Sequence, residues 1–177
     1  MDAPQMPPGV IAAARDAVKA HLRTIGTGED ALIERHAASA LALCEAFTGQ
    51  AVILREHVDP VAADGIWRRL GAAPVAAITR VTGADDVVPD AGAFAIDIDA
   101  RREGWVRASM PGRVARVTYD AGLASAWDGL PPPLAQGVVL LAAHLLNGAT
   151  VEPPAAVTAL WRPWRRMRVR GGGDART

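Results

Sequence analysis

Apolar residues recur every three or four positions over the first fifty residues, which is the period of an amphipathic helix. One stripe predicts a helix over residues 8–25, with prolines before it and Gly26 as its stop signal. A second stripe predicts a helix over residues 28–48, ending at Gly49. The stripe positions are Ile11, Ala14, Val18, Leu22 and Ile25, followed by Ile33, Ala37, Ala40, Leu41, Cys44 and Phe47.

The pattern changes between residues 51 and 122, where short runs of β-branched and aromatic residues alternate with Gly, Pro and Asp. In "AFAIDID", residues 93–99, apolar and acidic side chains fall on opposite faces of an extended chain. The stretch "SMPGRV" favours a hairpin turn at Pro111–Gly112. About five short strands separated by turns predict a small antiparallel sheet.

The helical period returns over residues 131–162, after a proline start signal. Apolar residues cover nearly all faces of the first of these helices, which predicts that protein surrounds it. Such a helix needs more cover than one small subunit readily supplies, and this favours self-association. Pro163 ends the second helix.

These elements predict an α+β fold: a small helical bundle of two N-terminal and two C-terminal helices with an inserted small antiparallel β-sheet. We expect residues 1–177 to form a single domain, with helices at about 8–49 and 131–162, the β insert at about 51–122 and a basic tail at 163–177.

Charge is unevenly distributed although the formal net charge is zero. Residues 162–177 hold six arginines against one aspartate, a local charge of +5, so the remainder carries −5. The start of the chain lacks the features of a signal peptide, and the longest apolar run is too short to cross a bilayer. We therefore expect a soluble intracellular protein without membrane contact.

Residues that could carry chemistry show no catalytic or ligand spacing. The single Cys44 excludes an internal disulfide, and the four histidines lack metal-site spacing. His144 is best interpreted as a core or interface residue. Asp97 and Asp99 share one strand face, where solvated acids are commoner than an acid/base pair. We expect no enzyme activity, no metal and no cofactor.

The end of the chain, "TALWRPWRRMRVRGGGDART", combines tryptophan with arginine. Those residue types anchor protein interfaces. They also clamp phosphates and stack on bases. A third interpretation is that the tryptophans cap the core and the arginines are solvated. Composition alone leaves the three open.

Several stretches, in the same order along the chain, resemble the head–tail connector (adaptor) family of tailed phages. "PPPLAQGVVLLAAHLLNG" followed by "PPAAVTALWRPWRRMRV" resembles a family pattern that ends in "PYRR", with Trp164 in place of the tyrosine. "AVKAHLR…GEDALIERHAASALALCEAFTGQ" resembles its opening helix pair, which ends in "TGR", and "VTYDAG" resembles "VxYxAG". The Arg- and Ala-rich form is most similar to the version carried by gene transfer agents.

The resemblance implies a structural virion protein, assembled in the bacterial cytoplasm, that forms a ring, usually a dodecamer, between the portal and a stopper or tail protein. DNA would pass through its channel without sequence-specific binding. The implied portal-docking residues are Trp161, Arg162, Trp164, Arg165, Arg166, Arg168 and Arg170. Leu41, Leu141, His144 and Leu145 are expected in ring or core packing. The alternative function is a nucleic-acid-binding module that uses the tail as an arm.

Overall fold

A computed structural model describes residues 4–83, 86–148, 153–166 and 175–176, without the side chains of 111–113 and 175–176. The chain divides into two compact units. The helical unit comprises Gln5–Ile53 and Leu123–Met167, and the sheet unit comprises Met1–Pro4, Leu54–Gly122 and Arg168–Thr177. The predicted α+β class, with helices from both ends of the chain and an inserted antiparallel sheet, is confirmed.

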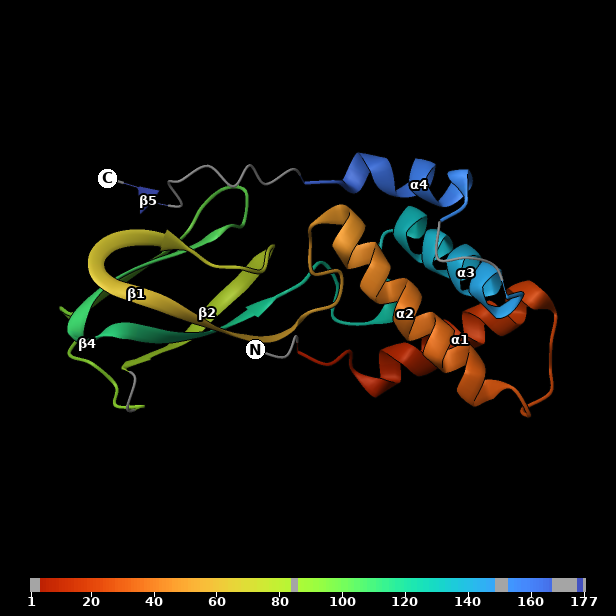
Figure 1. Ribbon diagram of the computed structural model, residues 1–177, viewed down its shortest axis with the longest axis horizontal. Coiled ribbons are helices and arrows are strands. Elements are labelled where there is room, and N and C mark those ends of the chain that lie inside the picture. Colours follow the sequence, from red (N-terminus) through yellow and green to blue (C-terminus); the bar gives the residue numbers. More distant parts are fainter. Residues whose placement is uncertain (1–3, 84–85, 149–152, 167–174, 177) are drawn as a thin grey trace. The chain divides into compact units, whose positions relative to one another are not determined.

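The helices of the helical unit pack against one another (Figure 1). They enclose one apolar core. Its α-helices are α1 (Pro8–Leu22), α2 (Asp30–Thr48), α3 (Pro132–Leu146) and α4 (Ala155–Trp161), with short 3-10 turns η1 (Trp127–Gly129) and η2 (Arg162–Trp164). Prolines begin α1 and α3, where a missing N–H costs nothing. Gly49 ends α2 in the left-handed conformation, at φ 67°.

The first helix is shorter than the apolar stripe predicts. Arg23 adopts a left-handed conformation at φ 55° and ends α1 after Leu22. Ile25 is therefore not part of the buried stripe, and its side chain is 98% exposed in the loop before α2. The spacing of Ile25 matched the helical period, but the backbone leaves the helix before reaching it.

Helix α3 is the centre of the bundle. It contacts α1, α2 and α4, and its apolar side chains are buried or packed against the core of the same chain. An apolar residue on nearly every face is thus explained by neighbours in one subunit, and the pattern does not require a second copy. No helix among the described residues is long and apolar enough to cross a membrane.

The sheet unit is built on one long antiparallel ribbon. Its strands are β1 (Arg55–Arg69), β2 (Val75–Gly83), β3 (Phe94–Ile98), β4 (Gly104–Ala121) and β5 (Ala175–Arg176). β1 pairs with β4 along nearly its whole length, and β2 and β3 both pair with the other edge of β4. β5 adds two residues beside β1.

The ribbon curls back on itself (Figure 1). Val75 pairs with Ala121 at the end of β4, while its N–H donates to the carbonyl of Arg102, just before β4 begins. A straight strand of this length would hold its ends about 55 Å apart. The ends of β4 can share one neighbour only because β1 and β4 bend together.

The predicted hairpin turn at Pro111–Gly112 is wrong. Both residues lie inside β4, which runs without a break where two strands were expected. The register between β1 and β4 shifts between the pairs Ala62–Val114 and Asp64–Ser109, which places a bulge there. The Pro-Gly pair therefore sits at the bend of one strand, because bulges accept residues that interrupt regular pairing.

Inside the curl, Tyr119 joins the ribbon to the segment that follows β1. Its hydroxyl donates to Asp59 Oδ2 at 2.8 Å and accepts the N–H of Ala72 at 2.9 Å. Asp59 Oδ2 also accepts the N–H of Gly71 at 2.6 Å. Tyr119 is fully buried and its ring stacks on His57, its two hydroxyl bonds are partly buried, and the bond from Gly71 to Asp59 is exposed.

Candidate functional site

The best candidate site is the basic, aromatic stretch at residues 161–166, here called the docking segment. It begins with Trp161, the last residue of α4, whose side chain is fully buried. The indole Nε1 donates to the carbonyl of Leu134 on α3 at 3.3 Å. The structure thus places Trp161 in the core, in line with the interpretation that the tryptophans cap the core, and not on the exposed docking surface that was also predicted.

Gly137 of α3 makes room for this indole. A Cβ atom built on Gly137 would lie 2.1 Å from Trp161 Nε1, far inside van der Waals contact. The close approach of α3 to Trp161 therefore depends on a glycine at this position.

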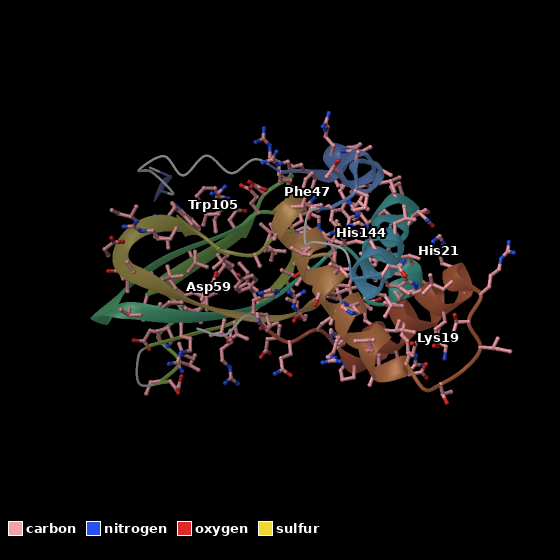
Figure 2. The ribbon with its side chains drawn as sticks, turned by 45° about the vertical axis from the view of Figure 1, so that its right-hand side comes forward. Lys19, His21, Phe47, Asp59, Trp105 and His144 are labelled. Atoms are coloured by element: carbon pink, nitrogen blue, oxygen red, sulfur yellow. The ribbon has the colours of Figure 1, made fainter. Side chains whose placement is uncertain are left out.

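Phe47, near the carboxyl-terminal end of α2 (Figure 2), contacts both Trp161 and an arginine of the segment. The rings of Phe47 and Trp161 are tilted, with centroids 5.8 Å apart. The guanidinium carbon of Arg165 lies 5.7 Å from the centroid of the Phe47 ring. This is the geometry of a cation–π contact.

The turn that follows Phe47 bonds the segment's backbone. We call residues 47–50 the α2 turn. Gln50 Nε2 donates to the carbonyl of Trp164 at 2.5 Å, and the N–H of Arg166 donates to the carbonyl of Thr48 at 2.7 Å. The second bond satisfies one of the carbonyls that a helix end leaves without an intrahelical partner.

The outward side of the segment is basic. Arg162 and Arg165 are exposed, and Trp164 and Arg166 are half-buried. The last turn of α2 has no basic residue of its own, so Arg165 brings positive charge to the negative end of that helix. The other two residues expected to dock, Arg168 and Arg170, lie outside the described residues.

The residues predicted for ring or core packing divide in two. Leu41 and Leu141 are fully buried in the core of their own chain, so their side chains cannot reach a neighbour in this structure. His144 and Leu145, near the end of α3, are half-buried and retain exposed surface. Figure 2 shows His144 on this helix.

The α2 turn was not predicted to be part of the site. The signal was present as "FTGQ", the last four letters of the stretch that resembles the family's opening helices. Nothing in its local pattern indicates that it contacts residues more than one hundred positions later. That pairing depends on the packing of the whole bundle.

Asp97 and Asp99 were considered as an acid/base pair, and hydrogen bonds within a turn explain the presence of Asp99. Asp99 Oδ1 accepts the N–H groups of Arg101 and Glu103, both at 2.9 Å, and its Oδ2 accepts Trp105 Nε1 at 3.3 Å. Asp97 is exposed on β3. Among the described residues, no group of three or more His, Cys, Asp or Glu side chains could hold a metal ion.

The pKa values of Cys44 and Asp64 are shifted. Burial raises the pKa of the Cys44 thiol to about 12 from its ordinary 9.0, with Glu45 adding to the effect, so this thiol stays protonated at neutral pH. On β1, the hydrogen bond from Arg68 lowers the pKa of the Asp64 carboxyl. Neither group belongs to the docking segment.

Solved structures of gene transfer agent particles contain chains similar to this one. The neck of the empty particle, computed with C6 symmetry, matches at a TM-score of 0.75 and 28% identity, covering 97% of this chain and 99% of that chain. The neck of the native particle, computed with C12 symmetry, matches at 0.74 and 28%, with coverage of 97% and 99%. The virion of the native particle matches at 0.71 and 30%, with 97% of each chain covered.

No protein-family profile and no curated protein matches the sequence. The likeness to structural chains of particles nevertheless spans both units. The chain belongs to the head–tail connector (adaptor) family of phage-like particles, in the form carried by gene transfer agents.

Proposed function

We propose that this chain is the head–tail adaptor of a gene transfer agent particle, acting as one connector over its whole length. Copies form a ring between the portal and the stopper or tail component and extend the channel through which DNA passes. The observation that carries this proposal is the match to neck chains over 97% of the sequence. The role is structural, and the ring assembles in the bacterial cytoplasm and is carried in the particle neck.

The docking segment is the part of the adaptor that we assign to the portal. Exposed Arg162 and Arg165 offer planar guanidinium groups that pair with carboxylates through two hydrogen bonds. Half-buried Trp164 adds a rigid apolar surface beside them. This combination fits an acidic protein surface with apolar patches.

A closed ring requires two different complementary faces on each subunit. His144 and Leu145 are half-buried at the end of α3, and we propose that they contribute to one of these faces. The fully buried Leu41 and Leu141 support the ring only indirectly, by holding the bundle together.

Capture by the cognate portal ring tests the docking assignment. We expect the charge reversals Arg162→Glu and Arg165→Glu together to weaken capture at least about tenfold, since repulsion replaces pairing at an interface. The matched control reverses two exposed arginines elsewhere in the helical unit, Arg23→Glu and Arg35→Glu, and should bind as wild type does. Truncation before Trp161 is a poor test because it removes a core side chain.

Double-stranded DNA in place of the portal tests the alternative function. The adaptor proposal expects no retention by DNA at physiological salt. A nucleic-acid module would instead bind DNA with an affinity that falls steeply with salt, in proportion to the phosphates contacted. Capture by DNA and not by the portal would overturn the adaptor proposal.

A further inference from the structure

We infer that the α2 turn, residues 47–50, is a clamp that positions the docking segment, residues 161–166, before any partner binds. The inference rests on the proposed function for its purpose, but the clamp itself is a property of the free chain. Residues 47–50 act as positioning residues, and the arginines of the segment make the contacts with the partner.

Two hydrogen bonds fix the register of the segment against the turn. One runs from Gln50 Nε2 to the carbonyl of Trp164, and the other from the N–H of Arg166 to the carbonyl of Thr48. The two bonds hold backbone atoms two residues apart, so the segment cannot slide along the turn without breaking both. Gln50 is only 5% exposed, which shelters its bond from competing water.

Side-chain contacts also fix the position of the docking segment against the α2 turn. Phe47 contacts Trp161 at one end of the segment and the Arg165 guanidinium near the other. Because Trp161 is fully buried, the segment starts from a fixed point in the core. Arg162 and Arg165 are thereby left on the outside.

Gly49 lets the segment approach closely. Its φ is 67°, a conformation that favours glycine, and an added Cβ would lie 2.8 Å from the carbonyl oxygen of Arg166. The neighbour here is backbone, which cannot rotate away as a flexible side chain can. A side chain at position 49 would therefore push the segment off the turn.

A clamped segment has a definite advantage for docking. Ordering a flexible tail on binding costs conformational entropy that is subtracted from the affinity. A segment held in place beforehand has already lost that freedom, so its arginines meet the partner in a fixed arrangement.

Hydrogen–deuterium exchange in the free chain tests the clamp directly. In wild type we expect the amides of Arg165 and Arg166 to be protected, since both are bonded. Gln50→Glu replaces the donor by an acceptor and should speed their exchange about tenfold. Gln136→Glu, at an exposed position of α3, is the matched control and should leave it unchanged. Gln50→Arg restores an N–H donor and should recover protection.

A pair of glycine variants separates the clamp from general backbone strain. Gly49→Ala and Gly148→Ala both place alanine at a positive φ, 67° and 73°, but Gly148 has nothing within 4 Å of the added Cβ. Both should lose some stability. Only Gly49→Ala should also release the amides of Arg165 and Arg166 at temperatures where the bundle stays folded.

Portal capture then connects the clamp to function. Gln50→Glu should weaken capture about tenfold and Gln50→Arg should restore it, whereas loss of fold alone would not be rescued in this way. Unprotected Arg165 and Arg166 amides in wild type, or equal exchange in Gln50→Glu, would overturn the clamp. If wild type is not captured at all, the proposed function fails while exchange still decides whether the clamp exists.

Discussion

At the scale of single residues, the helical unit depends on a few close approaches that leave no room for other side chains. Trp161 lies so near α3 that a Cβ on Gly137 would reach its ring nitrogen. A glycine inside a helix ordinarily costs about 1 kcal/mol relative to alanine. Its presence at position 137 is explained by packing, since only hydrogen fits beneath the indole.

Gly137→Ala should therefore destabilise the protein by about 2 kcal/mol, because overpacking outweighs the gain in helix propensity. Urea unfolding measures the change in free energy. Gly9→Ala is the control: Gly9 lies in α1 with nothing within 4 Å of an added Cβ, so this variant should be neutral or slightly stabilising. Equal stability of the two variants would contradict the role assigned to Trp161.

Cys44 predicts a pH dependence of stability. Its pKa is about 12 in the folded chain against an ordinary 9.0, so only the unfolded chain ionises it between those values. The resulting stability is fully present below pH 9 and falls as pH rises toward 12, by up to about 1.4 kcal/mol per pH unit. Urea unfolding of wild type and Cys44→Ala at several alkaline pH values checks this. The variant should show the shallower decline, and parallel declines would refute the assignment.

At the scale of elements, the sequence pattern predicts the parts that local spacing governs. The four α-helices of the described residues were expected from stripes and prolines, and β3 from its alternation, whereas the 3-10 turns η1 and η2 were not. The curl of β1 and β4 was not predictable, because it arises from pairing between residues about fifty positions apart. Pro111–Gly112 has the composition of a turn, and only the partner strand shows that the chain continues through it.

Substitution of Tyr119 tests whether its hydrogen bonds stabilise the curled sheet. Tyr119→Phe removes the hydroxyl that donates to Asp59 and accepts from Ala72. The N–H of Ala72 then loses this acceptor inside the sheet unit. We expect a loss of about 1–3 kcal/mol. Thr79→Val is the control, since its hydroxyl bonds Thr118 at an exposed position. Calorimetric melting of both variants decides, and an unaltered Tyr119→Phe transition would show that these bonds do not hold the curl closed.

At the scale of the whole molecule, composition identified the docking segment as the candidate site but did not distinguish its buried residues from its exposed ones. Trp161 and Arg162 are neighbours of similar interest by composition, yet one is buried and the other exposed. The four-residue spacing of Val157 and Trp161 places both on the buried face of α4, and this was the available signal. The contacts with residues 47–50 had no such signal, because the bundle brings together distant parts of the chain.

The exposed apolar surface of the chain predicts its oligomeric state before assembly. Helix α3 contacts α1, α2 and α4 of its own chain. Among the described residues, Ile25 is the one exposed large hydrophobic side chain of the helical unit, and the others lie in the sheet unit: Val58, Ile66, Val87, Val88, Ile96, Ile98 and Val114. A stable ring interface generally needs a larger apolar contact than the helical unit offers, and the proposed ring residues His144 and Leu145 lie in that unit. We therefore expect the isolated chain to be a monomer of 18.5 kDa at micromolar concentration, and the ring to form on the portal.

Light scattering after size-exclusion chromatography measures that mass directly. The protein should elute as a monomer alone and as a much larger complex after incubation with the portal ring. His144→Glu with Leu145→Glu should reduce the number of copies bound per portal. Because Leu145 also packs against the core, circular dichroism of the free variant first establishes that it is folded. If the isolated chain forms a closed ring, its subunit contacts are sufficient for assembly without the portal, and portal-driven assembly is wrong.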